Sequence, residues 1–178
     1  MPEPTAAAQA FWHAVRRQYG LSDATPCQTF YFGMGEPVAT QLAQLVVCGR
    51  KRATTSLLQT QIEQPSEAPV LGGYSVVTNA AGAPAAVIRT VALHVFRFRD
   101  VPAWFAEREG EDEGEGDVCL ASWKAGHAQY FTRYLAAQGQ TFDEQMEVIC
   151  ESFDLLAVHP AFDAAAARRD PPTTQPTS

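Results

Sequence analysis

The feature that most constrains the fold is a long run of β-forming residues at positions 85–98. It contains Val87, Ile88, Val91, Val95 and Phe96, all of them residue types that are enriched in strands. A strand usually has about 5–6 residues, so this run predicts a strand that bends or carries a β-bulge. A bend of that kind favours the curvature of a small barrel.

Helices and further strands are predicted on both sides of this run. Helical spacing of apolar residues indicates helices at 6–19, 37–48 and 119–138, and Pro102 opens a short helix that extends to Glu107. β-Prone segments indicate strands at 28–32, 54–56, 74–78 and 145–156, with a turn at 79–82. Residues 59–69 are polar, contain two prolines and are expected to form a surface loop. The pattern predicts an α+β fold.

Composition predicts one globular domain over residues 1–160 and a disordered tail at 161–178. No apolar run approaches the roughly 18 residues of a membrane span, and the first residues lack the features of a secretory signal. The expected location is therefore the cytoplasm, with no membrane partner. The formal charge is -7, and without the seven acids and one arginine of residues 107–117 it is only -1.

A basic segment followed by hydroxyl residues stands out against this acidic background. It consists of Arg50, Lys51 and Arg52, then Thr54, Thr55 and Ser56. Grouped cations can attract phosphate whatever the distant charge is. The alternative is a solvated turn, because cations just past a helix end also complement the helix dipole. Alternation along the predicted strand directs Thr54 and Ser56 to one face and Thr55 to the other.

Aromatic residues recur with helical spacing along the predicted helix at 119–138. They are Trp123, His127, Tyr130, Phe131 and Tyr134. Such a stripe indicates a surface that faces the core, with His127 as a partly buried histidine that has its hydrogen bonds satisfied. The alternative is a binding face on which Trp123 stacks against a base. The four cysteines and four histidines are widely spaced, and their pattern does not indicate structural zinc.

Two separated motifs resemble the ASCH domain family. Residues 49–57 are similar to the family segment G-[KR]-K-x-A-T-x-S-L, and residues 113–127 are similar to its segment EGEGD…L…W…H. The resemblance covers residues 31–156. It implies a PUA-like fold, which is a small mixed β-barrel flanked by helices. It also implies that the ligand is RNA or a modified nucleoside, because many members of the superfamily bind one of them.

The resemblance also implies the residues of the site. The expected catalytic residues are Lys51, Thr54, and Glu113 or Glu115. The expected substrate-binding residues are Arg50, Arg52, Thr55, Ser56, Ser122, Trp123 and His127. Met34 departs from the family pattern, where Asp is common, and Arg52 replaces a common Thr. An additional acidic unit at 109–111 leaves the choice of glutamate open, and Glu109, Glu111 and Asp112 are themselves expected to be solvated.

Several functions are compatible with these residues. A ribonuclease is favoured, in which Lys51 counters charge on phosphate, a glutamate takes a proton and the arginines position the backbone. An amidohydrolase of N4-acylated cytidine-type nucleosides is the nearest alternative, with Thr54 orienting the substrate carbonyl. A non-catalytic RNA-binding module and a protein-interaction domain are the others. The acidic stretch offers oxygen ligands for Mg²⁺ or Mn²⁺, and the sequence leaves open whether the protein is a monomer or a dimer.

Overall fold

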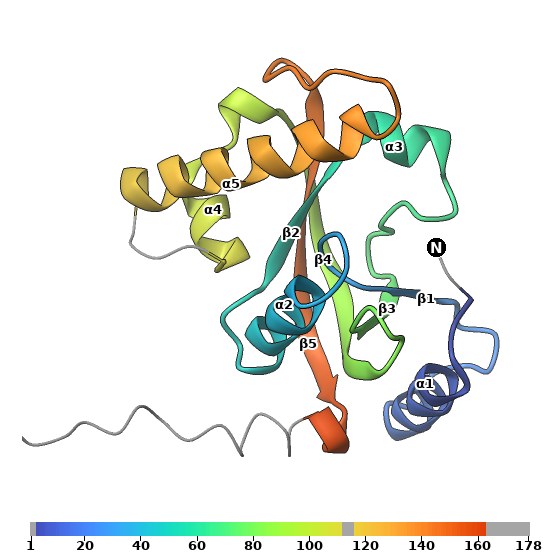
Figure 1. Ribbon diagram of the computed structural model, residues 1–178. Coiled ribbons are helices and arrows are strands. Elements are labelled where there is room, and N and C mark those ends of the chain that lie inside the picture. The colour runs from blue at the N-terminus through green and yellow to red at the C-terminus, as the bar shows by residue number, and fades with distance from the viewer. Residues whose placement is uncertain (1–2, 112–115, 163–178) are drawn as a thin grey trace, which may run out of the picture.

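The computed structural model describes residues 3–111 and 116–162, which form helices around one mixed sheet (Figure 1). The sheet has five strands in the order β1-β3-β4-β5-β2. Their bounds are β1 (Cys27–Phe30), β2 (Ala53–Leu57), β3 (Tyr74–Thr78), β4 (Pro84–Arg97) and β5 (Glu147–Val158). β1 pairs with β3 in parallel, and the other pairs are antiparallel. The predicted α+β fold is confirmed.

The long strands β4 and β5 form the centre of the sheet. β3 pairs with only the first part of β4, and β2 pairs with only the first part of β5. The ladder between β4 and β5 shifts register at Val87/Ile88 and again at Thr90/Ala92, so the irregularity predicted for the long run is confirmed. The closed barrel is not confirmed, because among the described residues β1 and β2 remain the two edges of an open sheet.

Two helices cover one end of the sheet. The helix α1 (Ala6–Gln18) begins at Thr5, whose hydroxyl accepts a hydrogen bond from the backbone N–H of Ala8 at 3.2 Å. Its apolar face buries Phe11 and Trp12 against β3 and β4. The helix α2 (Val38–Val47) packs its small buried residues against the same two strands and β5. Its end is followed by Gly49, which has a φ of 87°.

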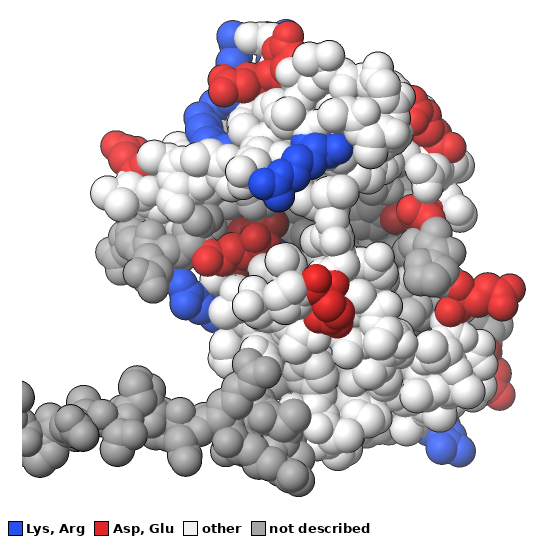
Figure 2. All heavy atoms as spheres, in the orientation of Figure 1, with Lys and Arg blue, Asp and Glu red and all other residues white. Residues whose placement is uncertain are grey.

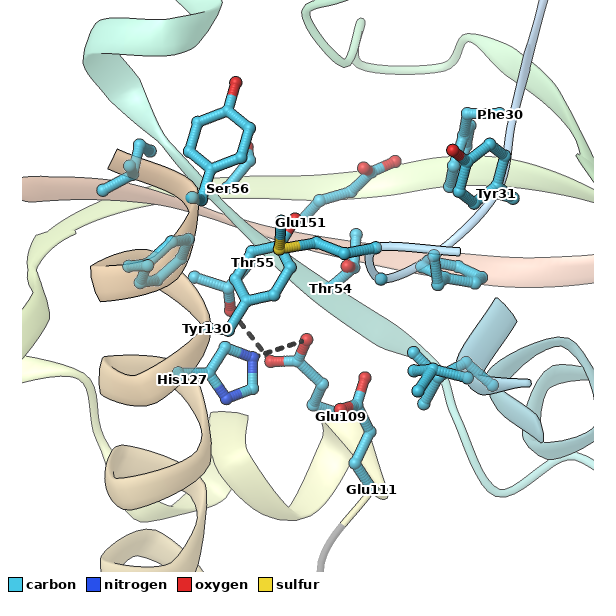
Figure 3. Close-up of a pocket in the computed structure, with 18 of the residues that line it drawn as sticks. Phe30, Tyr31, Thr54, Thr55, Ser56, Glu109, Glu111, His127, Tyr130 and Glu151 are labelled. Atoms are coloured by element: carbon cyan, nitrogen blue, oxygen red, sulfur yellow. Dashed lines mark hydrogen bonds and ion pairs between the residues drawn. The ribbon is translucent and has the colours of Figure 1, made fainter. Parts of the chain in front are cut away.

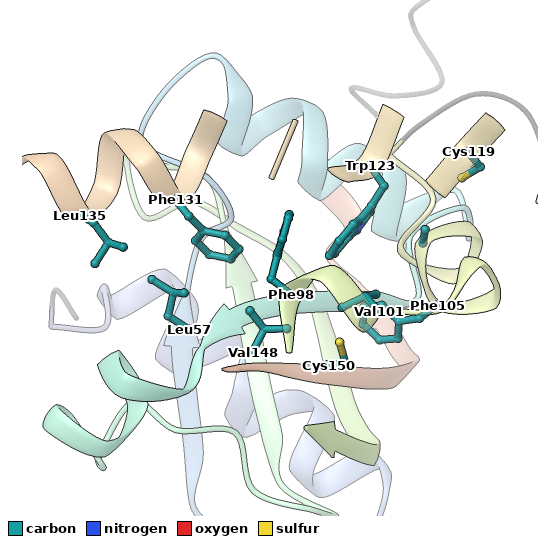
Figure 4. Close-up of a cluster of buried hydrophobic side chains, with 12 residues drawn as sticks. Leu57, Phe98, Val101, Phe105, Cys119, Trp123, Phe131, Leu135, Val148 and Cys150 are labelled. Carbon is teal, nitrogen blue, oxygen red and sulfur yellow. The ribbon is translucent and has the colours of Figure 1, made fainter. Parts of the chain in front are cut away.

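The other end of the sheet is covered by α4 (Ala103–Glu109) and α5 (Gly116–Ala136) (Figure 4). The aromatic stripe of α5 buries Trp123 and Phe131, which are 0% and 2% exposed and pack around Phe98. The interpretation of this stripe as a core-facing surface is therefore confirmed for Trp123 and Phe131, whereas His127, Tyr130 and Tyr134 are only partly buried. This packing holds the last turn of α4 against α5, and residues of both helices contribute to the candidate site.

One prediction about an irregular segment was wrong. Residues 59–69 are not loop throughout, because the helix α3 (Leu58–Glu63) forms before the first proline of that segment is reached. Residues 160–162 form a helical turn, and Phe162 packs against the buried cluster that contains Ala43 and Val46 of α2. Residues 163–178 of the predicted tail lie outside the described residues. None of the helices in the described ranges has the length and apolar content needed to span a membrane.

Candidate functional site

A cavity of about 850 Å³ lies between the two edge strands of the sheet. β1 and the loop that follows it form one wall, β2 and α3 form another, and α2 and α5 complete it. The aromatic residues that line it are Phe30, Tyr31, Phe32, Tyr130, Phe131 and Tyr134. Figure 2 shows a hollow on this face with acidic atoms on its wall. The volume lies in the range of small-molecule sites, about 300–1,000 Å³.

A buried ion cluster lies at one side of this cavity. The side chain of Lys51 is fully enclosed, and its Nζ is 3.2 Å from Oε1 of Glu109 and also contacts Glu111. The same Nζ lies 4.9 Å from the ring centre of Phe32. Glu109 is 1% exposed, and both carboxylates line the cavity, whereas Lys51 is not among the lining residues. The lysine therefore supports the two carboxylates from behind.

Glu109 is the centre of the cluster, with four side-chain partners (Figure 3 shows part of it). Its Oε2 accepts hydrogen bonds from the hydroxyl of Thr55 at 2.8 Å and from Nε1 of Trp123 at 2.7 Å. Its Oε1 faces Lys51 and Nε2 of His127, the latter at 3.3 Å. Four partners fix the position of this carboxylate, and it acts as the support of the site rather than as a free base.

Charge governs the protonation states of the cluster. Burial alone would raise the pKa of Glu109, but the charges of Lys51 and His127 hold it well below the usual range of a carboxyl group. Burial alone would lower the pKa of Lys51, and the carboxylates of Glu109 and Glu111 raise it instead. The pKa of His127 is raised as well, because the charge of Glu109 outweighs burial. The lysine and the central glutamate are therefore both charged at neutral pH.

The structure brings together four of the predicted site residues around a glutamate that was not predicted. Lys51, Thr55, Trp123 and His127 all contact Glu109. The expectation that Glu109 is solvated was wrong, because it lies on the buried face of α4. The spacing could have indicated this, since Glu109 follows the buried Phe105 and Ala106 by four and three residues. Glu113 and Glu115 lie outside the described residues.

The hydroxyl residues of β2 divide between two faces, as alternation predicted. Thr55 reaches the ion cluster, and Thr54 is the register partner of Glu151 on the neighbouring strand. Thr54, Thr55 and Ser56 all line the cavity, because β2 is an edge strand and side chains on both of its faces can reach the cavity. The structure gives the Thr54 hydroxyl no side-chain partner within the described ranges.

Four of the expected substrate-binding residues, Arg50, Arg52, Ser122 and Trp123, do not line the cavity. Arg50 and Ser122 are exposed elsewhere. A guanidinium nitrogen of Arg52 donates to the carbonyl oxygens of Val46 and Lys51 at 2.9 Å each. The alternative interpretation of Arg52 as a cation at the helix end is therefore confirmed.

Two aromatic residues of α5 differ in what they offer to a ligand. Stacking of Trp123 on a base was a wrong expectation, because the ring is 0% exposed and packs against Phe98. His127 lies one turn further on, is partly buried, and lines the cavity. Its Nδ1 lies 3.0 Å from the Trp123 carbonyl, which orients the ring.

The sequence interpretation also missed Glu151 on β5. This side chain is 7% exposed, lines the cavity and accepts a hydrogen bond from the hydroxyl of Thr90 at 2.5 Å. An acid within the segment 148–153, which is otherwise apolar apart from Ser152, was the available signal, because an isolated buried charge is costly. Among residues 3–111 and 116–162, no group of three or more acidic, histidine or cysteine side chains is arranged to hold a metal ion.

These observations define an α+β protein with an open mixed sheet and a partly open cavity between its two edge strands, with aromatic and acidic side chains on the cavity wall. The chain belongs to the ASCH domain family, whose model matches residues 28–157. ASCH domains are generally RNA-binding, which supports a nucleic-acid ligand at that general level. No curated protein matches the chain.

Two solved structures are similar over nearly the whole chain. A protein from Enterococcus faecalis is 26% identical with a TM-score of 0.77, and the match covers 92% of this chain and 96% of that one. An ASCH domain from Lactobacillus crispatus is 28% identical with a TM-score of 0.75, and the match covers 89% of this chain and 99% of that one. The fold is therefore shared over most of the chain with both bacterial structures.

Proposed function

We propose that this protein binds a single nucleoside unit in the cavity and hydrolyses an acyl group from its base. The observation that supports this most strongly is the cavity itself, which combines aromatic walls with two carboxylates held by a buried lysine. Aromatic rings suit a base, which unstacked nucleotides present to proteins. The favoured location remains the cytoplasm, where nucleosides and RNA are available.

The geometry favours a compact ligand over an extended RNA strand. Arg50 and Arg52, which were expected to hold the RNA backbone, do not line the cavity. Arg133 is the only Lys or Arg side chain on its described wall, and His127 is the one other basic group there. A ribonuclease that tracks a polyanion would need more positive charge along its groove. The amidohydrolase alternative therefore becomes the first choice.

The catalytic roles that we assign within the cluster depend on which carboxylate is still able to accept a proton from water. Glu109 is occupied by four partners, whereas Glu111 is 25% exposed and has Lys51 as its one ion-pair partner within the described ranges. We assign Glu111 as the base that takes a proton from water. Water adds to the acyl carbon while Thr54 donates to the carbonyl oxygen. The C–N bond then breaks, and the proton passes from Glu111 to the departing nitrogen.

The test is turnover of N4-acetylcytidine by the wild type and by Glu111→Gln. The substitution keeps the shape of the side chain and removes the base, so we expect turnover to fall by about 10²–10⁴-fold. The exposed Glu147→Gln is a matched control and should keep full activity. Full activity of Glu111→Gln would contradict the assignment of the base, and no turnover by the wild type would contradict the hydrolase.

Recognition of a nucleoside within RNA, without hydrolysis, is the second candidate. It is supported by membership in a family that generally binds RNA. Binding of a short RNA that persists in the wild type without any product, and that weakens when Tyr130→Ala opens the aromatic wall, would favour it. If the wild type cleaves RNA and Glu111→Gln abolishes this cleavage, the ribonuclease hypothesis would be favoured instead.

A further inference from the structure

A second polar wall faces the cavity, apart from the Lys51 cluster. Its residues that line the cavity are Ser75 on β3, Glu151 on β5 and Thr54 on β2, and Thr90 on the intervening strand β4 holds Glu151 without lining the cavity itself. Ser75, Thr90 and Glu151 are 5%, 3% and 7% exposed. Glu151 and Thr54 are direct partners across an antiparallel pair and so face the same side of the sheet. The carboxyl group of Glu151 is thus buried and accepts a hydrogen bond from a hydroxyl, whereas the carboxylate of Glu109 pairs directly with Lys51.

One oxygen of Glu151 is held and the other is available. The hydroxyl of Thr90 donates to Oε1 at 2.5 Å, and within the described ranges the structure gives Oε2 no hydrogen-bond partner. In Figure 3 the Glu151 side chain extends away from Glu109, towards the part of the cavity where Phe30 and Tyr31 lie. A ring that stacks on these aromatic residues would present its edge to the carboxyl group.

The surroundings favour the neutral form of this carboxyl group. Burial raises the pKa of Glu151, although the hydrogen bond from Thr90 and the charge of Lys51 lower it in part. The neutral acid can donate from Oε2, whereas the ionised form can only accept. The side chain therefore differs from Glu109, which four partners hold in the ionised form.

We propose that Glu151 is the residue that recognises the base: it donates a hydrogen bond from its carboxylic acid to a ring nitrogen or carbonyl oxygen of the nucleobase. Thr90 fixes the rotamer by occupying the other oxygen. This inference rests on the proposed nucleoside ligand and adds a determinant of its recognition. It separates the two carboxyl regions of the cavity, with chemistry at Glu111 and base recognition at Glu151.

Other ionisable groups face the same cavity and must be separated from Glu151 by experiment. They are Glu36 and Glu67 from loops, Glu109 and Glu111 from the end of α4, and His127 and Arg133 from α5. Three tyrosines, Tyr31, Tyr130 and Tyr134, also line it. His127 is the most serious competitor, because it is a histidine whose pKa the charge of Glu109 raises.

The test is calorimetric binding of cytidine and uridine, which carry ring acceptors but no acyl group, between about pH 5.5 and 8.5. Wild-type affinity should fall by up to about tenfold per pH unit once Glu151 ionises, because binding then requires one proton. Glu151→Gln keeps a donor and an acceptor of the same shape, so it should bind with an affinity that no longer depends on pH. Glu151→Leu should bind at least tenfold more weakly than Glu151→Gln.

Each outcome decides the inference. A pH slope that persists in Glu151→Gln would assign the proton to another group, such as His127, and would overturn it. A flat wild-type profile, or wild-type affinity in Glu151→Leu, would overturn it as well. If Glu151→Leu does not fold, the pH profile of Glu151→Gln alone decides. Absence of any nucleoside binding by the wild type would overturn the proposed function together with the inference, whereas binding that ignores Glu151 would overturn only the inference.

Discussion

Replacing Glu109 by Gln should cost much of the stability of the protein. The substitution keeps the size of the side chain but removes its charge, so Lys51 keeps only Glu111 as a carboxylate partner among the described residues. One oxygen is replaced by an amide nitrogen, which cannot accept. If the amide nitrogen takes the place of Oε2, it faces the donors of Thr55 and Trp123. If it takes the place of Oε1, it faces Lys51 and His127.

The magnitude follows from the burial of both charges. Lys51 and Glu109 are 0% and 1% exposed, and removing one partner of such a pair costs about 3–5 kcal/mol. For a chain of this size about 1 kcal/mol shifts the melting temperature by about 2–4 °C. We therefore expect a fall of about 6–20 °C, and a loss of about 3–5 kcal/mol in urea unfolding at neutral pH.

Two further measurements test the reasoning. The exposed Glu144→Gln is the control and should stay within about 0.5 kcal/mol of the wild type. The pKa of Glu109 is lowered in the folded state, so its stabilising charge is present above the unfolded pKa and is lost as pH falls. The gap between wild type and Glu109→Gln should thus narrow in acid. A loss below about 1 kcal/mol at neutral pH would refute the cluster as a stabilising unit.

Three other substitutions test separate parts of the site. The pKa of His127 is raised, so the stability that its charge contributes is fully present below the unfolded pKa of about 6.5 and is lost as pH rises through the folded pKa. His127→Gln should therefore lower the unfolding free energy more at acidic than at alkaline pH. An equal loss at both would contradict this. Gly110→Ala would place a Cβ 2.2 Å from a backbone carbonyl oxygen at a φ of 66°, so urea unfolding should register a loss above about 2 kcal/mol. The control Gly139→Ala has a φ of 70° but open space and should lose only about 1 kcal/mol; equal losses would exclude the steric cause. Trp123→Phe keeps an aromatic ring, although a smaller one, and removes the indole N–H that donates to Glu109 at 2.7 Å. The unfolding free energy should fall by about 1–3 kcal/mol, and no measurable loss would count against a stabilising role of that hydrogen bond.

The elements could be predicted because their patterns are local. The apolar spacing of α5, the glycine after α2 and the β-rich run of β4 each depend on neighbours within a few residues. The length of β4 also indicated its irregular register, which the structure confirms at two positions. Closure of a barrel could not be predicted, because it depends on whether the distant strands β1 and β2 meet.

The site residues that belong to a sequence motif were predicted, and the site residues that only tertiary contacts bring into the site were missed. Lys51 and His127 are in the motifs, and both contact the central carboxylate. Glu109 was missed because a run of acids is usually solvated, and only the docking of α4 on α5 buries this one. Glu151 was missed because its partner Thr90 is 61 residues away along the chain. The presence of an acidic residue in the sequence does not by itself indicate that its side chain is buried or which distant residue it contacts.

The pairing of β2 has a consequence for how the chain acquires its site. β2 carries the hydroxyl residues and directly follows Lys51, yet within the described ranges its sheet partner is β5, the last strand. During synthesis, the segment with Lys51 therefore emerges from the ribosome long before the strand that secures it. Contacts between such distant segments close large loops and form late in folding. A chain that stops before residue 147 would thus contain the whole motif and still lack the site.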